Sequence, residues 1–204
     1  MRRFIVIGHK AVTDSGFTLD DLCGSAGRLD VLIRALHSSL LLSHGIRRDT
    51  EILLVLLGKP IPPRIIRISG ETVKYLNPDE RSTGALLRQA LAKSHHAPED
   101  GEIETTPGMF ISQGGLEDIQ EMFSEENFVL LHQDGEDIRN ADISPDSIFI
   151  LSDHMEFTQE NMNIIKHLRP NKVSLGPVVV HTHHAITLAH NELDRMAGKS
   201  SKDI

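Results

Sequence analysis

The C-terminal part of the sequence holds the side chains and backbone breaks best suited to chemistry. An apolar run over residues 172–180 is interrupted by Gly176 and Pro177, and a polar segment with three histidines follows it. Glycine frees the φ angle and proline removes a hydrogen-bond donor, so the backbone can bend sharply and present its amides and carbonyls to a ligand. Ligand sites of α/β proteins favour such strand ends. The pattern therefore predicts a small-ligand site around Gly176.

The three histidines, His181, His183 and His184, are candidate metal ligands because neutral imidazole binds zinc. Adjacent and alternate residues, however, point in different directions on either a strand or a helix. The sequence places no carboxylate or cysteine close by to complete a convergent set. We therefore predict that the chain has no metal site.

Two other candidate strands of the C-terminal half also end in small or polar residues. Residues 128–131 lead into the loop 132–135, and residues 147–151 lead into the loop 152–154. If these strands are parallel neighbours of residues 172–175, all three loops leave the same edge of a sheet and enclose a pocket. The sequence has no GxGxxG after its first strand and no GxxxxGK[ST], which argues against a nucleoside triphosphate or ordinary dinucleotide site.

Strand-like and helix-like patterns alternate along the chain, which predicts an α/β fold with a mostly parallel sheet flanked by helices. The predicted strands cover residues 3–7, 51–57, 64–68, 108–111, 128–131, 147–151 and 172–175. The predicted helices cover residues 29–40, a segment capped by Asn77, residues 115–123, a segment from the cap Thr158 to before Pro170, and residues 182–196. Two acidic segments, 98–106 and 135–146, are predicted to be loops.

Length and cysteine content indicate the broad class of protein. The 204 residues suffice for one domain with a buried core. Cys23 is the only cysteine and cannot form an internal disulfide, and the sequence shows neither a signal peptide nor a long apolar span. We therefore expect a cytoplasmic protein with no membrane partner.

The charge is unevenly distributed along the chain. The net charge of −8 argues against non-specific binding to nucleic acid, and we expect no DNA partner. Residues 1–75 carry 11 Lys and Arg against 7 Asp and Glu, whereas residues 76–204 carry 10 against 22. A polyanion is therefore expected to meet the N-terminal third, although an uneven solvated surface would give the same pattern.

Several segments resemble the archaeal tRNA pseudouridine-54 N1-methyltransferases, which belong to the SPOUT class of knotted methyltransferases. The specific ones are FILSDH over residues 149–154, VSLGP over 173–177, HAIT over 184–187 and HNELDR over 190–195. The segments SAGRLDVL over residues 25–32 and GIRRD over 45–49 also look like this family. The resemblance therefore covers nearly the whole chain.

The resemblance implies a single domain over residues 1–204 that acts on tRNA as a homodimer with S-adenosylmethionine as methyl donor. It implies an RNA-facing part, residues 1–106, and a cofactor-binding part, residues 107–204, with a C-terminal trefoil knot. The implied cofactor contacts are Leu131, Ser152, Ser174, Leu175, Gly176, Pro177 and Ala185. Ser152 replaces a common glycine and Ala185 a common cysteine, and the alanine excludes a covalent thiol route at that position.

The acceptor side of such a reaction needs groups that hold the base and its proton. Asp30 is the first candidate for recognising the base or accepting the N1 proton, with Arg28 and Arg47 holding the adjacent phosphate or base carbonyl. In a dimer of this class, these residues would face the partner's cofactor pocket. Asp30 and Arg34 also lie four residues apart on a predicted helix, so a surface ion pair is the alternative explanation.

Two other functions are compatible with the sequence. The first is methylation of a pseudouridine in ribosomal RNA. The second is a catalytically silent RNA-binding or ribosome-assembly protein with the same fold, which the changes at Ser152 and Ala185 would allow. Binding of S-adenosylmethionine distinguishes the silent protein from an enzyme.

Overall fold

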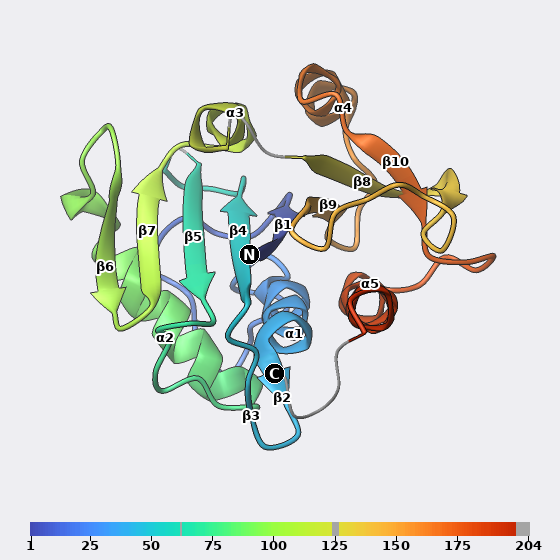
Figure 1. Cartoon of the computed structure of the whole chain (residues 1–204). Helices are drawn as coiled ribbons and strands as arrows, with labels where there is room; N and C mark the ends of the chain where they lie inside the picture. The colour runs from blue at the N-terminus through green and yellow to red at the C-terminus, as the bar shows by residue number, and fades with distance from the viewer. Residues whose placement is uncertain (62, 124–126, 199–204) are drawn as a thin grey trace.

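The computed structural model describes residues 1–61, 63–123 and 127–198, and these residues build a central sheet of eight strands (Figure 1). The strand order is β10-β8-β9-β1-β4-β5-β7-β6. Neighbours from β10 to β4 pair in parallel, whereas β5, β7 and β6 extend the sheet by antiparallel pairing. The predicted α/β fold with a mostly parallel sheet is confirmed. The strands are β1 (Arg2–Gly8), β4 (Thr50–Leu56), β5 (Arg64–Ser69), β6 (Glu102–Thr106), β7 (Met109–Gln113), β8 (Phe128–Asp137), β9 (Ile148–Ser152) and β10 (Asn171–Ser174), and a separate hairpin joins β2 (Leu41–Leu42) to β3 (Gly45–Ile46).

Helices cover both faces of the sheet (Figure 1). One face carries α1 (Leu29–Leu40), α2 (Glu80–Ala92) and α5 (Thr182–Met196), and the other carries α3 (Ile119–Met122) and α4 (Gln159–His167). The short 3-10 helices η1 (Ser94–His96) and η2 (Leu116–Asp118) follow α2 and precede α3. None of the helices in the described part of the chain has the length and apolarity that a membrane span requires.

The apolar strands are buried on both sides, which explains their nearly continuous hydrophobic sequences. In β1, Phe4 and Val6 join the core that includes α1, α2 and α5, whereas Ile5 and Ile7 join the core on the opposite face. All four side chains are fully buried. Burial on alternating sides fixes the register of β1, and hence the position of the loop that follows it.

Two segments that the sequence predicts to be loops are partly strands. Residues 102–106 form the edge strand β6, and residues 135–137 belong to β8. The acidic composition of residues 98–106 led to the prediction of a loop. In the structure Glu102 pairs with Arg67, whose Nε lies 3.0 Å from the carboxylate. An edge strand tolerates charged residues of this kind.

The predicted helices are found with two corrections. Asp79 rather than Asn77 caps α2, because its carboxylate accepts a hydrogen bond of 2.7 Å from the Ser82 backbone N–H. The predicted helix over residues 115–123 is divided into η2 and α3. The Thr158 cap of α4 is confirmed, with Oγ1 accepting a hydrogen bond of 3.1 Å from the Asn161 backbone N–H.

The strands β8 and β10 cross closely beside the predicted ligand loops. Lys172 pairs with Leu130, but the next residue, Val173, pairs with Glu136. Residues 131–135 therefore leave the ladder and return to it. At the point of return, a Cβ added to Gly135 would lie 2.5 Å from the backbone N and C of Val173. Only glycine permits this approach of the two backbones.

Candidate functional site

The carboxyl ends of β8, β9 and β10 meet at one edge of the sheet, because these strands are parallel neighbours. The loops that follow them, together with the start of α5, line two cavities of about 480 and about 100 Å³. The larger one is within the usual size range for small-molecule sites, roughly 300–1,000 Å³. The two cavities share Leu131, His132, Gln133, Val179, Val180 and Ala185. The pocket predicted from three strand ends is therefore present.

The larger cavity combines an apolar wall with acidic side chains. Leu151, Phe157 and Met162 contribute to the apolar part of its lining. The carboxylates come from Asp134, Asp153 and Glu156. Such a site suits a ligand with an apolar ring at one end and positive charge at the other.

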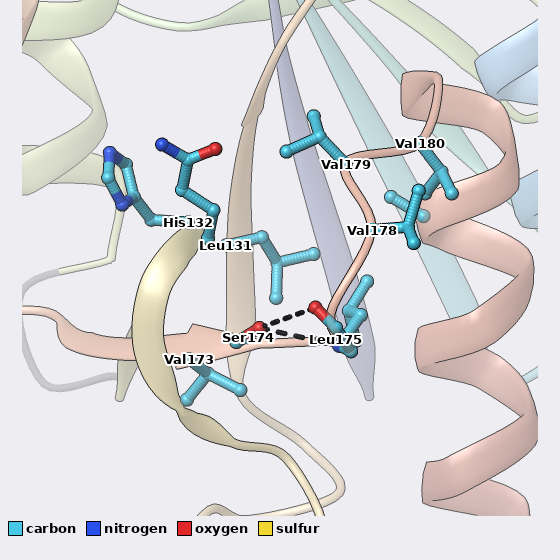
Figure 2. A pocket seen from close by; sticks show the side chains of 11 residues that line it. Leu131, His132, Val173, Ser174, Leu175, Val178, Val179 and Val180 are labelled. Carbon is cyan, nitrogen blue, oxygen red and sulfur yellow. Dashed lines mark hydrogen bonds between the residues drawn. The ribbon is translucent and has the colours of Figure 1, made fainter.

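The smaller cavity lies where Leu131 faces the segment after β10. Figure 2 shows Leu131 pointing toward the segment that carries Val178 and Val179. The turn at its floor is closed by Ser174, whose Oγ donates to the Gly176 carbonyl at 3.1 Å and accepts from the Gly176 N–H at 3.3 Å. Gly176 has φ 141°, a value that side chains rarely adopt, so this turn requires glycine.

Six of the seven predicted cofactor residues line one or both cavities. Leu131 and Ala185 line both, Ser152 lines the larger, and Ser174, Leu175 and Gly176 line the smaller. Pro177 lines neither of these two cavities, although both of its chain neighbours line the smaller one. The residue at 185 contributes a methyl group to the lining.

The loop after β9 is tied to the beginning of α5 by hydroxyl groups. Thr182 Oγ1 lies 2.6 Å from the Ser152 carbonyl and 3.0 Å from the Asp153 carbonyl. The Ser152 hydroxyl donates to the Met155 carbonyl. Ser152 therefore adds a hydrogen bond within the turn, and it also lines the larger cavity. The sequence analysis predicted the start of a helix at Thr182 but not these two contacts of its hydroxyl group.

His9 forms a second contact to this loop that the sequence analysis missed. It follows β1, whose carboxyl end lies at the same sheet edge, because Ile7 pairs with Ser152. His9 Nδ1 lies 3.0 Å from Asp153 Oδ1, and His9 Nε2 lies 2.9 Å from Asn161 Oδ1. The sequence signal was present, since β1 is one more strand that ends in polar residues. Its partners, however, are 144 and 152 positions away.

The predicted acceptor residues Asp30 and Arg28 form one ionic group with Arg34. Arg28 Nε lies 3.0 Å from Asp30 Oδ1, and Arg34 donates to Asp30 Oδ2. Burial raises the pKa of the Asp30 carboxyl, but the hydrogen bonds and charges of the two arginines outweigh burial and hold the pKa below its ordinary value of 3.8. Asp30 is therefore ionised at neutral pH and is a weak base in this state.

Arg28 has an unusual backbone conformation. Its φ angle of 67° is left-handed, which is uncommon outside glycine and often marks functional positions. The hydrogen bond to Asp30, and to a smaller extent the charge of Asp153, raise the pKa of Arg28.

Arg47, in contrast, is buried in an intramolecular ion pair. Its two terminal nitrogens lie 3.1 and 2.8 Å from the carboxylate oxygens of Asp194 in α5. The Arg47 side chain is only 7% exposed. This arrangement does not support the predicted contact of Arg47 with RNA, because both ends of the guanidinium are already paired. No local pattern in the sequence indicates a partner 147 residues away.

The three histidines of the C-terminal segment lie close to one another at the start of α5. The ring centroids of His183 and His184 are 4.0 Å apart, and those of His181 and His183 are 5.8 Å apart. Burial, together with the neighbouring positive charges, lowers the pKa of His183, so this ring is neutral at pH 7. Within the described part of the chain, no three metal-ligating side chains are arranged to hold an ion.

Comparison with solved structures identifies the fold. The crystal structure of Archaeoglobus fulgidus Nep1 bound to S-adenosylhomocysteine superposes with a TM-score of 0.65, covering 97% of this chain and 99% of Nep1. The two sequences are 16% identical. This likeness shows that the chain has the same fold as that protein.

Sequence comparison identifies the family. Residues 1–198 match the family described as "Putative SAM-dependent RNA methyltransferase". A protein of Methanococcoides burtonii named tRNA (pseudouridine(54)-N(1))-methyltransferase is 47% identical over 204 residues, covering 98% of this chain and 100% of its own length. A protein of the same name from Methanocella arvoryzae is 46% identical over 195 residues, covering 96% and 100%. The chain belongs to this methyltransferase family, as the resemblance predicts.

Proposed function

We propose that this chain is an S-adenosylmethionine-dependent methyltransferase that methylates N1 of pseudouridine 54 in the thymine loop of tRNA. The observation that carries the proposal is the identity of 41–47% with proteins of that named activity, over nearly the whole chain. The pocket at the ends of β8, β9 and β10 supports it, because the family-specific segments 149–154 and 173–177 contribute to its lining. Such an enzyme works in the cytoplasm, where tRNA is found.

The lining of the larger cavity fits S-adenosylmethionine. An adenine ring suits the apolar side chains of Leu131, Leu151 and Val179. The positive groups of the methionine part suit the carboxylates of Asp134 and Glu156. When bound, S-adenosylmethionine supplies a methyl group on a sulfonium.

The residues of the chain act mainly by alignment. Holding donor and acceptor in a near-attack geometry contributes about 7–11 kcal/mol to lowering a barrier of this kind. We assign Arg28 and Asp30 to the acceptor base and its neighbouring phosphate, and the seven predicted residues from Leu131 to Ala185 to the cofactor. Arg47 is left out of this assignment because it is buried against Asp194.

The proposal includes a C-terminal trefoil knot and a homodimer. The close crossing of Gly135 and Val173 supports the knot, because β10 passes beside the loop that leaves β8. Exposed apolar side chains support the dimer, since Val178 and Val179 are 72% and 73% exposed and Met196 is 43% exposed. In this proposal residues 1–106 face the RNA and residues 107–204 hold the cofactor.

Transfer of labelled methyl groups tests the proposed function. The protein is incubated with methyl-labelled S-adenosylmethionine and one of two tRNA transcripts, with pseudouridine or plain uridine at position 54. We expect label only in the pseudouridine transcript, because uridine carries its glycosidic bond at N1. Label in neither transcript, despite cofactor binding, would point to ribosomal RNA, and absence of cofactor binding would favour a silent RNA-binding protein.

The variant Asp30→Asn tests the acceptor assignment. We expect methyl transfer to fall by about a hundredfold, the loss that a displacement of roughly 1 Å in a site can cause, because Asp30 holds the Arg28 side chain in place. Affinity for S-adenosylhomocysteine, measured by calorimetry, should be retained. The control is Glu80→Gln, which removes the other carboxylate partner of Arg34 at a side chain that is 43% exposed. Undiminished transfer by Asp30→Asn would remove Asp30 from any proton-transfer role.

A further inference from the structure

Both ring nitrogens of His9 face hydrogen-bond acceptors. Nδ1 lies 3.0 Å from Asp153 Oδ1, and Nε2 lies 2.9 Å from Asn161 Oδ1. The amide atom of Asn161 is identified as oxygen, because the Thr158 backbone N–H donates to it at 3.2 Å. The His9 side chain is 6% exposed, so water has little access to the ring.

This environment selects the protonated ring. A neutral imidazole has one N–H group and can serve only one of two acceptors, whereas imidazolium serves both. The Asp153 carboxylate also accepts the backbone N–H groups of His9 at 3.0 Å and Met155 at 2.9 Å. The hydrogen bond that His9 donates to Asp153 raises the pKa of His9 above its ordinary value of 6.5. Burial raises the pKa of Asp153, but hydrogen bonds from His9 and Met155 outweigh it, so the carboxyl stays ionised.

The protonated ring joins two parts of the cavity wall. On one side it holds Asp153, which lines the larger cavity together with Met155. On the other side it holds Asn161 in the first turn of α4, next to Met162, which also lines that cavity. Loss of the His9 proton removes one of these two hydrogen bonds and so loosens the wall between β9 and α4.

We propose that His9 is a positioning residue for the cofactor pocket and that the pocket binds its ligand most tightly while His9 is protonated. This inference rests on the proposed function, which supplies the ligand. Because the folded-state pKa of His9 is raised, the tight form is present below pH 6.5 and is lost as the pH rises through the raised value. Binding and protonation are reciprocal, so the bound ligand raises the pKa of His9 further.

Other charged groups near this pair affect it without contacting the ring of His9. His154 Nδ1 lies 3.4 Å from Asp153 Oδ2, and its side chain is 27% exposed. The charge of Arg28 also interacts with Asp153. Both groups interact with the Asp153 carboxylate and not with the His9 ring. Substitution of His154 is therefore a matched control for a pH dependence that arises from His9.

Calorimetric titration with S-adenosylhomocysteine from about pH 6 to about pH 8.5, the range in which histidines titrate, tests the inference. For the unchanged protein we expect the dissociation constant to rise about tenfold across this range, within the usual span of coupling between sites. His9→Gln should bind more weakly with no such rise. His154→Gln should keep the profile of the unchanged protein. Asn161→Asp should move the rise to higher pH, because it adds a negative charge beside the ring and retains the acceptor for Thr158.

A second measurement keeps the test independent of how the variants fold. Two-dimensional NMR of the ¹⁵N-labelled ring in the unchanged protein reports the protonation of His9 directly, with and without S-adenosylhomocysteine. A neutral ring at pH 6.5, or the same affinity profile in folded His9→Gln, would overturn the inference and leave the proposed function intact. Absence of binding at every pH would overturn both.

Discussion

Replacing Asp194 by alanine is expected to lower the free energy of unfolding by about 3–5 kcal/mol, the usual cost of removing one partner of a buried ion pair. Arg47 donates two hydrogen bonds to the Asp194 carboxylate, and Arg2 donates one at 3.1 Å. The two arginine side chains are 7% and 2% exposed. Burial already lowers the pKa of Arg2, with the Asp194 charge opposing this effect. Without the carboxylate, two cations would remain in a site that water hardly reaches.

The position of this cluster explains why its loss affects the whole domain. Arg2 belongs to β1 and Asp194 belongs to α5, so the pair fixes the last helix to the central strand. His190, one turn earlier in α5, accepts from Arg2 at Nδ1 and donates from Nε2 to the Ser39 carbonyl of α1 at 3.1 Å. Burial holds the pKa of His190 well below 6.5, which keeps the ring neutral for this pair of hydrogen bonds.

Thermal and denaturant unfolding measure the effect of Asp194→Ala. A loss of 3–5 kcal/mol corresponds to a fall in Tm of about 2–4 °C per kcal/mol for a protein of this size. The matched control is Glu192→Ala on the same helix, where the partner Arg139 is 71% exposed and the expected change is below about 1 kcal/mol. Equal effects of the two substitutions would show that the Asp194 cluster is solvated.

Much of the fold could be predicted because local patterns and packing agree. The helix over residues 182–196 is found with the predicted bounds, since its apolar residues Ile186, Ala189 and Leu193 are buried along one face. The pocket followed from three strand ends and the rule for parallel sheets. Strand β6 was missed because its acidic residues are typical of a loop, whereas Glu102 pairs with Arg67 of β5, a contact that no local pattern reveals.

The parts of the site that could not be predicted depend on pairs distant in sequence. Arg47 is of a residue type that often contacts RNA, but in the structure it forms a buried ion pair with Asp194, 147 residues later. His9 and Asp153 have no shared local pattern, and only the pairing of β1 with β9 brings them together. Residue types and spacing predict strand ends well. They do not predict which charged side chains form buried pairs, because that depends on the order of the strands in the sheet.

Replacing Gly135 by alanine is expected to reduce methyl transfer by about a hundredfold, the loss that a displacement of roughly 1 Å in a site can cause. The added Cβ would lie 2.5 Å from the N and C atoms and 2.6 Å from the Cα of Val173. These are backbone atoms of β10, so no side-chain rotation relieves the contact. Either β10 or the loop after Leu131 must move, and both line the smaller cavity.

Gly135→Ala should lower the free energy of unfolding only moderately, whereas it should strongly reduce ligand binding and methyl transfer. Overpacking typically costs about 1–3 kcal/mol, because neighbouring elements shift to absorb the added methyl group. The shift here falls on the ligand loops, so affinity for S-adenosylhomocysteine should fall together with the methyl-transfer rate while the folded protein persists. The control is Gly45→Ala in the β2–β3 hairpin, where an added Cβ meets nothing within 4 Å. Equal affinity in the two variants would mean that β8 and β10 cross with more room than the structure shows, and would remove the reason for glycine at residue 135.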